Sequence, residues 1–134
     1  MFWGMSYVFS EQVYRHISVL TALAIETFII SIVIGLIAIF RGDFKTDLLT
    51  IDASSTVFWL LAASTLTFLI GELGIGFAID GKNATLAGLI EISYPLFIAL
   101  FAYLFFQESE LNIGTALGGA LIFCGICIIY WFSR

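Results

Sequence analysis

Four uninterrupted apolar segments constrain the fold of this 134-residue chain more than any other feature. They have 22 to 24 residues each and cover residues 17–40, 56–79, 84–106 and 111–132. At a rise of about 1.5 Å per residue, each can cross the roughly 30 Å hydrocarbon core of a bilayer as a helix. The composition is 61% hydrophobic and only 11% charged, which leaves too little polar surface for a water-soluble domain. We therefore expect an all-α integral membrane bundle.

A fifth apolar stretch, at the amino end, is too short to span the membrane alone. It covers residues 1–9 and is followed by Ser10, Glu11 and Gln12. This stretch has no basic residues at its start and no small-residue cleavage site after it. It is therefore not expected to be a signal peptide. We expect it to be a shortened first helix, and whether its beginning is truncated is left open. The expected helices are about 1–14, 17–40, 56–79, 84–106 and 111–132, in one domain over residues 1–134.

The charges lie almost entirely in the connections, and they exclude several kinds of partner. The net charge is −5, from five Lys and Arg and ten Asp and Glu. No basic cluster is present that could neutralise phosphates, so nucleic acid is not expected as a partner. The two cysteines, Cys124 and Cys127, lie one turn apart in an apolar segment and favour packing over redox chemistry. We expect no metal, no cofactor and no enzymatic activity, because the single histidine, His16, lies at a helix entrance without a nucleophile–base pair.

The counts of Lys and Arg do not decide the membrane orientation. Arg15, Lys82 and Arg134 are expected on one side, and Arg41 and Lys45 on the other. Orientation normally follows the excess of Lys and Arg on the cytoplasmic side. A three-to-two split leaves open either orientation, and also insertion in both directions.

Three glutamates, Glu26, Glu72 and Glu91, lie deep within apolar segments. The tight turn over residues 80–83 puts Glu72 and Glu91 roughly 10–12 Å below one membrane face, and Glu26 lies about 13–14 Å below it. Like charges this close in a low dielectric cannot all ionise, so at least one should hold a proton or exchange it for a bound cation. This favours a substrate- and proton-binding site. The alternative is three neutral carboxyl groups that only hold helices together through neighbouring Ser, Thr or Tyr.

Tyr94 and Pro95 follow Glu91 by three and four residues, and are expected on the same helical face. The hydroxyl of Tyr94 could bind the substrate or the carboxylate. Pro95 leaves the carbonyl of Glu91 without its helical donor and predicts a kink. A packed tyrosine and a tolerated membrane proline are equally consistent with the pattern.

Small residues in the last segment predict helix packing. Gly114, Gly118 and Gly125 form a stripe that lets another helix approach closely, either in this chain or in a second copy. A bundle of four or five short helices barely encloses a polar passage, which favours an oligomer.

Several runs of sequence resemble an EamA-type domain of the drug/metabolite transporter superfamily. Residues 84–130, with SYPLFIALFAYLFFQESELNIGTALGGALIFCGICII, are similar to the end of that domain. FWGMSYV over residues 2–8 is similar to its first-helix "WG" signature, and residues 17–42 to its second helix. The stripe formed by Gly118, Leu121, Ile122 and Gly125 also resembles the dimerising last helix of the small multidrug resistance branch. In the family, Glu often directly precedes the fourth-helix proline, whereas Tyr94 does so here.

The resemblance implies a secondary transporter built as one half-sized domain, where typical members have two. We expect a proton-coupled exporter of a small metabolite or drug-like compound, cationic compounds included, that works as a homodimer or as a heterodimer with a second small membrane subunit. The alternatives are a subunit of a heteromeric lipid-linked-sugar flippase and a non-transporting accessory protein. The expected location is the inner (plasma) membrane of a bacterial or archaeal cell. The expected substrate- and proton-binding residues are Glu26, Glu72, Glu91 and Tyr94.

Overall fold

The computed structural model describes residues 2–107 and 112–132, and every regular element in these ranges is a helix. In order, the elements are α1 (Phe2–Tyr14), α2 (Val19–Arg41), α3 (Asp43–Ala53), α4 (Ser55–Gly81), α5 (Ala84–Glu91), α6 (Tyr94–Phe101), the π-helical turn η1 (Ala102–Phe106) and α7 (Ile113–Phe132). Within the described ranges, four stretches can cross a membrane by length and composition: α2, α4, α5 through η1, and α7. The expected all-α membrane bundle with a shorter first helix is confirmed. The start of the last expected helix at residue 111, and also Met1 and Arg134, lie outside the described residues.

Polar residues between the apolar segments explain where the helices begin. Ser18, Ser54 and Asn83 precede α2, α4 and α5, and each side-chain oxygen accepts a hydrogen bond from the backbone N–H three residues on. Such caps satisfy donors that have no partner within the helix. At its other end, α2 is followed by Gly42, whose φ of 81° is a left-handed conformation that glycine adopts without strain. The observed ends therefore lie within a few residues of those expected.

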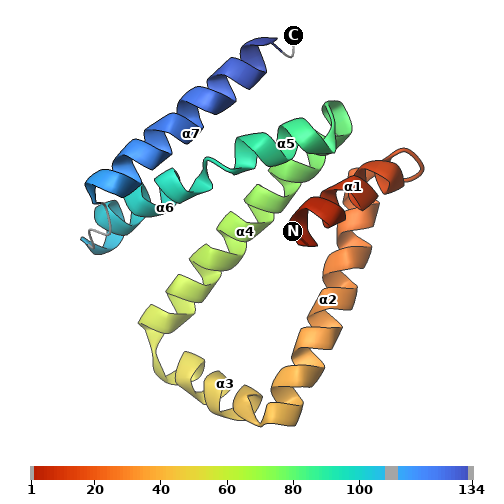
Figure 1. Cartoon of the computed structure of the whole chain (residues 1–134). Helices are drawn as coiled ribbons and strands as arrows, with labels where there is room; N and C mark the ends of the chain where they lie inside the picture. Colours follow the sequence, from red (N-terminus) through yellow and green to blue (C-terminus); the bar gives the residue numbers. More distant parts are fainter. Residues whose placement is uncertain (1, 108–111, 133–134) are drawn as a thin grey trace.

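The connection between the helices expected at 17–40 and 56–79 contains a further helix. This helix, α3, joins the ends of α2 and α4 that lie furthest from α1 (Figure 1) and contacts both of them. Asp43 lies in its first turn, where a negative charge interacts favourably with the helix dipole, and forms an ion pair with Arg41 at 3.1 Å. The sequence does not predict this helix, because the segment mixes polar and apolar residues and contains no continuous apolar run.

The span expected over residues 84–106 is divided into two helices. α5 ends at Glu91 and α6 begins at Tyr94, with a turn at Ile92 and Ser93 between them. Pro95 lies in the first turn of α6, where its missing N–H costs no helical hydrogen bond. In a continuous helix, the proline ring would clash with the carbonyl of Glu91 four residues earlier, so the interruption falls between Glu91 and Tyr94.

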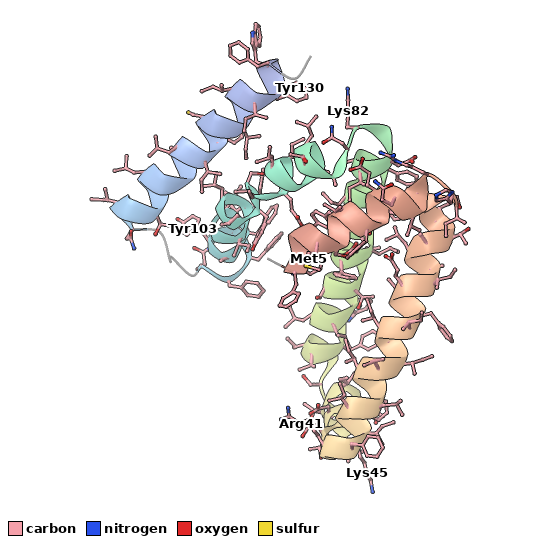
Figure 2. The ribbon with its side chains drawn as sticks, turned by 45° about the vertical axis from the view of Figure 1, so that its right-hand side comes forward. Met5, Arg41, Lys45, Lys82, Tyr103 and Tyr130 are labelled. Atoms are coloured by element: carbon pink, nitrogen blue, oxygen red, sulfur yellow. The ribbon has the colours of Figure 1, made fainter. Side chains whose placement is uncertain are left out.

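The core lies where α1 meets α2, α4 and α5. Its buried apolar residues are Tyr7, Tyr14, Val19, Ala22, Ile79, Ala84 and Ala87. α2 and α4 meet beside α1 and diverge toward α3, while α6 and α7 extend to the other side of α4 (Figure 1). Figure 2 shows Arg41 and Lys45 at the α3 end and Lys82 at the opposite end. Most apolar side chains of the spans are therefore exposed, as expected where lipid or another membrane protein surrounds them.

Candidate functional site

Gly76 brings three helices together near the end of α4. A Cβ atom at this position would lie 2.8 Å from Cγ1 of Val19 and 3.2 Å from Cδ1 of Leu23, both on α2. The hydroxyl of Tyr14 on α1 would be 3.6 Å from the same point. Because a methyl group would collide with the stiff Val19 side chain, glycine is what allows α2 and α1 to lie this close to α4.

This contact determines which way two of the glutamates face. Glu72 precedes Gly76 by four residues, and Glu26 follows Leu23 by three, so each shares the helical face that forms the contact. Both side chains are half-buried, and they interact electrostatically. Glu26 lies seven residues after the start of α2 and Glu72 nine before the end of α4, about 10–14 Å along their helices from the same end of the molecule.

The third glutamate, Glu91, is the last residue of α5 and accepts a hydrogen bond from the hydroxyl of Tyr7 on α1. One turn earlier on α5, Gly88 lies against the Tyr7 ring, since a Cβ there would be 3.5 Å from ring atom Cδ2. Glu91 also interacts electrostatically with Glu72. Three half-buried carboxyl groups from α2, α4 and α5 are thus brought together, with Glu72 interacting with both of the others.

Tyr94 is not joined to this group by a continuous helix. The turn at Ile92 and Ser93 interrupts the helical face that would carry Tyr94 beside Glu91, and the Tyr94 side chain is 56% exposed. The hydroxyl that bonds to Glu91 comes instead from Tyr7, which sequence reasoning missed.

α1 presents a row of hydroxyl-bearing residues to the other helices. Tyr7, Ser10 and Tyr14 are all buried and lie three and four residues apart, which is the spacing of one helical face. Tyr14 is hydrogen-bonded to Ser10 and interacts electrostatically with Glu26 and Glu72. The spacing is visible in the sequence and could have identified this face. The helices that it faces are known only from the fold.

Several hydroxyl groups within the spans are bonded to their own helices. Thr27 and Ser31 on α2 donate to the carbonyls of Leu23 and Phe28, at 2.6 and 2.8 Å. Thr65 and Thr67 on α4 likewise donate to carbonyls one turn earlier, both at 2.9 Å. Such hydrogen bonds to the preceding turn satisfy the hydroxyl locally. These four hydroxyl groups are therefore engaged within their own helices rather than with Glu26 or Glu72.

Glu11 connects α1 to the beginning of α5. Its Oε2 accepts a hydrogen bond from the backbone N–H of Ala84 at 2.9 Å, and its Oε1 accepts one from Arg15 at 3.2 Å. The N–H of Ala84, and to a smaller extent the Arg15 guanidinium, hold the pKa of the Glu11 carboxyl below its usual value. Tyr7 and Glu11 therefore attach α1 to both ends of α5.

Residues 2–107 and 112–132, which the structure describes, leave the glycine stripe of α7 uncovered. A Cβ at Gly118 or Gly125 would meet nothing within 4 Å, and one at Gly114 would meet only the neighbouring Asn112 side chain, at 3.2 Å. The glycine that packs inside the chain is Gly119, which lies against Leu96 of α6. The two cysteines of α7 are free and exposed.

These features define an integral membrane protein whose helical spans carry carboxyl groups. The model of the EamA-like transporter family matches residues 1–131, so the chain belongs to this family. The resemblance to an EamA-type domain is confirmed, whereas the similarity to the small multidrug resistance branch stays a prediction. No match is found among the curated proteins or among the solved structures. As a member of a transporter family, the chain is surrounded by lipid and acts on a small molecule.

Proposed function

We propose that this chain is one half-sized unit of a proton-coupled exporter, and that Glu26, Glu72 and Glu91 bind the cargo and the protons. The observation that carries this proposal is the interaction of Glu72 with both Glu26 and Glu91, each on a different membrane-spanning stretch. Carboxyl groups that interact in a low dielectric lose their protons in coupled steps. A bound cation and a proton therefore compete for the same negative charge.

This competition provides the coupling that a secondary transporter needs. On the side where protons are scarce, the carboxyl groups ionise and take up a cationic compound. On the other side, incoming protons displace that compound. Alternating access follows if two units rock about the shared site near the middle of the membrane. We place this exporter in the inner (plasma) membrane of a bacterial or archaeal cell.

The partner in this proposal is a second copy of the chain or a second small membrane subunit. The uncovered glycine stripe of α7 supports an association, because small residues let membrane helices approach closely. The exposed surface also supports it. The chain exposes 10627 Å², against about 7,000 Å² for a compact soluble monomer of 14.8 kDa.

Flux measurements in liposomes test the transport proposal. The protein is reconstituted with an acidic lumen, so that protons leave the vesicle as cargo enters, and entry of the fluorescent cation ethidium is recorded. We expect Glu72→Gln and Glu91→Gln to lower the proton-driven rate at least about tenfold, since each removes a titrating charge. Asp52→Asn is the matched control, because this carboxylate is exposed on α3 at the far end of the molecule. Unchanged flux in both glutamate variants would remove the coupling role.

The accessory-protein alternative predicts a different outcome for the same variants. If the glutamates only hold helices together, Glu72→Gln and Glu91→Gln should disturb assembly in detergent while the wild-type protein carries no proton-driven flux. Size-exclusion chromatography of each variant, run beside the flux assay, distinguishes the accessory-protein alternative from the transport proposal.

A further inference from the structure

The geometry points to Tyr7 as a positioning residue of the carboxyl site: its hydroxyl donates to Glu91 and favours the ionised form of that carboxyl group. This inference rests on the proposed function for its role in transport. Tyr7 itself belongs to α1, outside the spans that carry the glutamates.

The ring of Tyr7 is held in place by its neighbours. It is only 8% exposed, it lies against Gly88 of α5, and its centroid is 6.2 Å from that of Trp3 in a tilted arrangement. A side chain packed on two sides has little freedom to rotate away. Its hydroxyl is therefore fixed relative to the end of α5, where Glu91 accepts its hydrogen bond.

The helix that carries Tyr7 is fixed as well. Four residues after Tyr7, Glu11 accepts the N–H of Ala84, the first residue of α5. The two contacts attach α1 at both ends of the eight-residue helix α5, so α1 lies against α5. Glu11 therefore helps to hold α1, and with it Tyr7, beside α5.

Two negative electrostatic features lie beside Glu91. The carboxyl group belongs to the last residue of α5, where the helix dipole is negative, and it interacts with the like-charged Glu72 of α4. Glu26 of α2 acts on the same cluster through Glu72. A hydrogen bond donated to a carboxylate favours the ionised form, so the hydroxyl of Tyr7 offsets both effects.

The neighbouring elements supply few other titratable groups. Those that face Glu91 are Tyr7 from α1 and Glu72 from α4. The third neighbour of α5 is α7, whose titratable side chains are Cys124, Cys127 and Tyr130. None of these is a carboxyl group, so α7 adds no acid to the cluster.

The test follows the ionisation of Glu91 directly, without cargo. The full chain, with ¹³C-labelled glutamate carboxyl groups, is placed in lipid bilayers and titrated by NMR, and Glu91→Gln identifies the Glu91 signal. We expect Tyr7→Phe to move the titration midpoint of Glu91 upward by about one pH unit, the size expected for a hydrogen bond to a charged group. Tyr103→Phe is the control, because Tyr103 is an exposed tyrosine of η1 and should leave the midpoint unchanged.

A second variant keeps the test decisive if Tyr7→Phe fails to fold. A fluorinated tyrosine at position 7 keeps the ring and makes the hydroxyl a stronger donor, so it should move the midpoint downward. No movement of the midpoint in a folded Tyr7→Phe protein, or in the fluorinated protein, would overturn the inference. If the midpoint shifts but the protein does not transport ethidium, the role of Tyr7 is supported and the transport proposal is contradicted. The failure of one proposal can therefore be distinguished from the failure of the other.

Discussion

At the scale of single residues, the three glutamates of the site have different surroundings. Glu91 has a hydroxyl donor in Tyr7, whereas Glu26 is followed by Thr27, whose hydroxyl is bonded to the carbonyl of Leu23. Glu72 interacts with both other glutamates. Glu72 is therefore the member whose removal should affect the rest of the cluster most.

The contact between Glu11 and Ala84 predicts a pH-dependent stability. The pKa of Glu11 is lowered in the folded protein, so its contribution is present above the usual value of about 4.5 and is lost as the pH falls below it. Gln at this position can still accept the N–H of Ala84 but does not titrate. The difference in unfolding temperature between the wild type and Glu11→Gln should therefore shrink as the pH is lowered from about 5 to about 3. A difference that stays constant over this range would contradict the assigned contact.

At the scale of secondary-structure elements, one glycine decides how closely α2 and α4 pack. Gly76→Ala introduces a methyl group 2.8 Å from Val19, so we expect a loss of about 1–3 kcal/mol in the free energy of unfolding. Gly74→Ala is the matched control, since its Cβ would meet nothing within 4 Å and alanine favours helix. Reversible unfolding in mixed micelles measures both. Equal stability of the two variants would contradict the close approach at Gly76.

The ends of most helices could be predicted because polar caps interrupt long apolar runs. The layer of Glu26, Glu72 and Glu91 could also be predicted, since the tight turn before Ala84 fixes the relative depths of α4 and α5. The helix α3 could not, because its eleven residues lack an apolar run. The hydrogen bond between Tyr7 and Glu91 joins residues 84 positions apart, and no local pattern encodes which helix α1 will meet.

At the scale of the whole molecule, the chain has two kinds of surface. One surrounds the junction of α1 with α2, α4 and α5, where the buried residues are concentrated. The other consists of the outer faces of the spans, which are apolar and exposed. The glycines of α7 extend over about three turns, from Gly114 through Gly118 to Gly125, so α7 is where we expect the partner to bind.

Cysteine crosslinking in native membranes tests this association. On a background in which Cys124 and Cys127 are replaced by Ala, Gly118→Cys should form a disulfide across the interface. Ile34→Cys should not, because that residue is 60% exposed on α2, away from α7. The mass of the product distinguishes a second copy of the chain from a different small subunit. Absence of any product at position 118 would contradict an interface on α7.

The exchange of protons for a cation at Glu72 and its two neighbours is the central claim, and proton release on binding measures it most directly. Ethidium is added to the protein in weakly buffered detergent solution near neutral pH, and the released protons are counted per cation bound. The account predicts that the wild type releases protons and that Glu72→Gln, still folded, releases fewer. Ethidium binding without proton release, or equal release from both proteins, would contradict it.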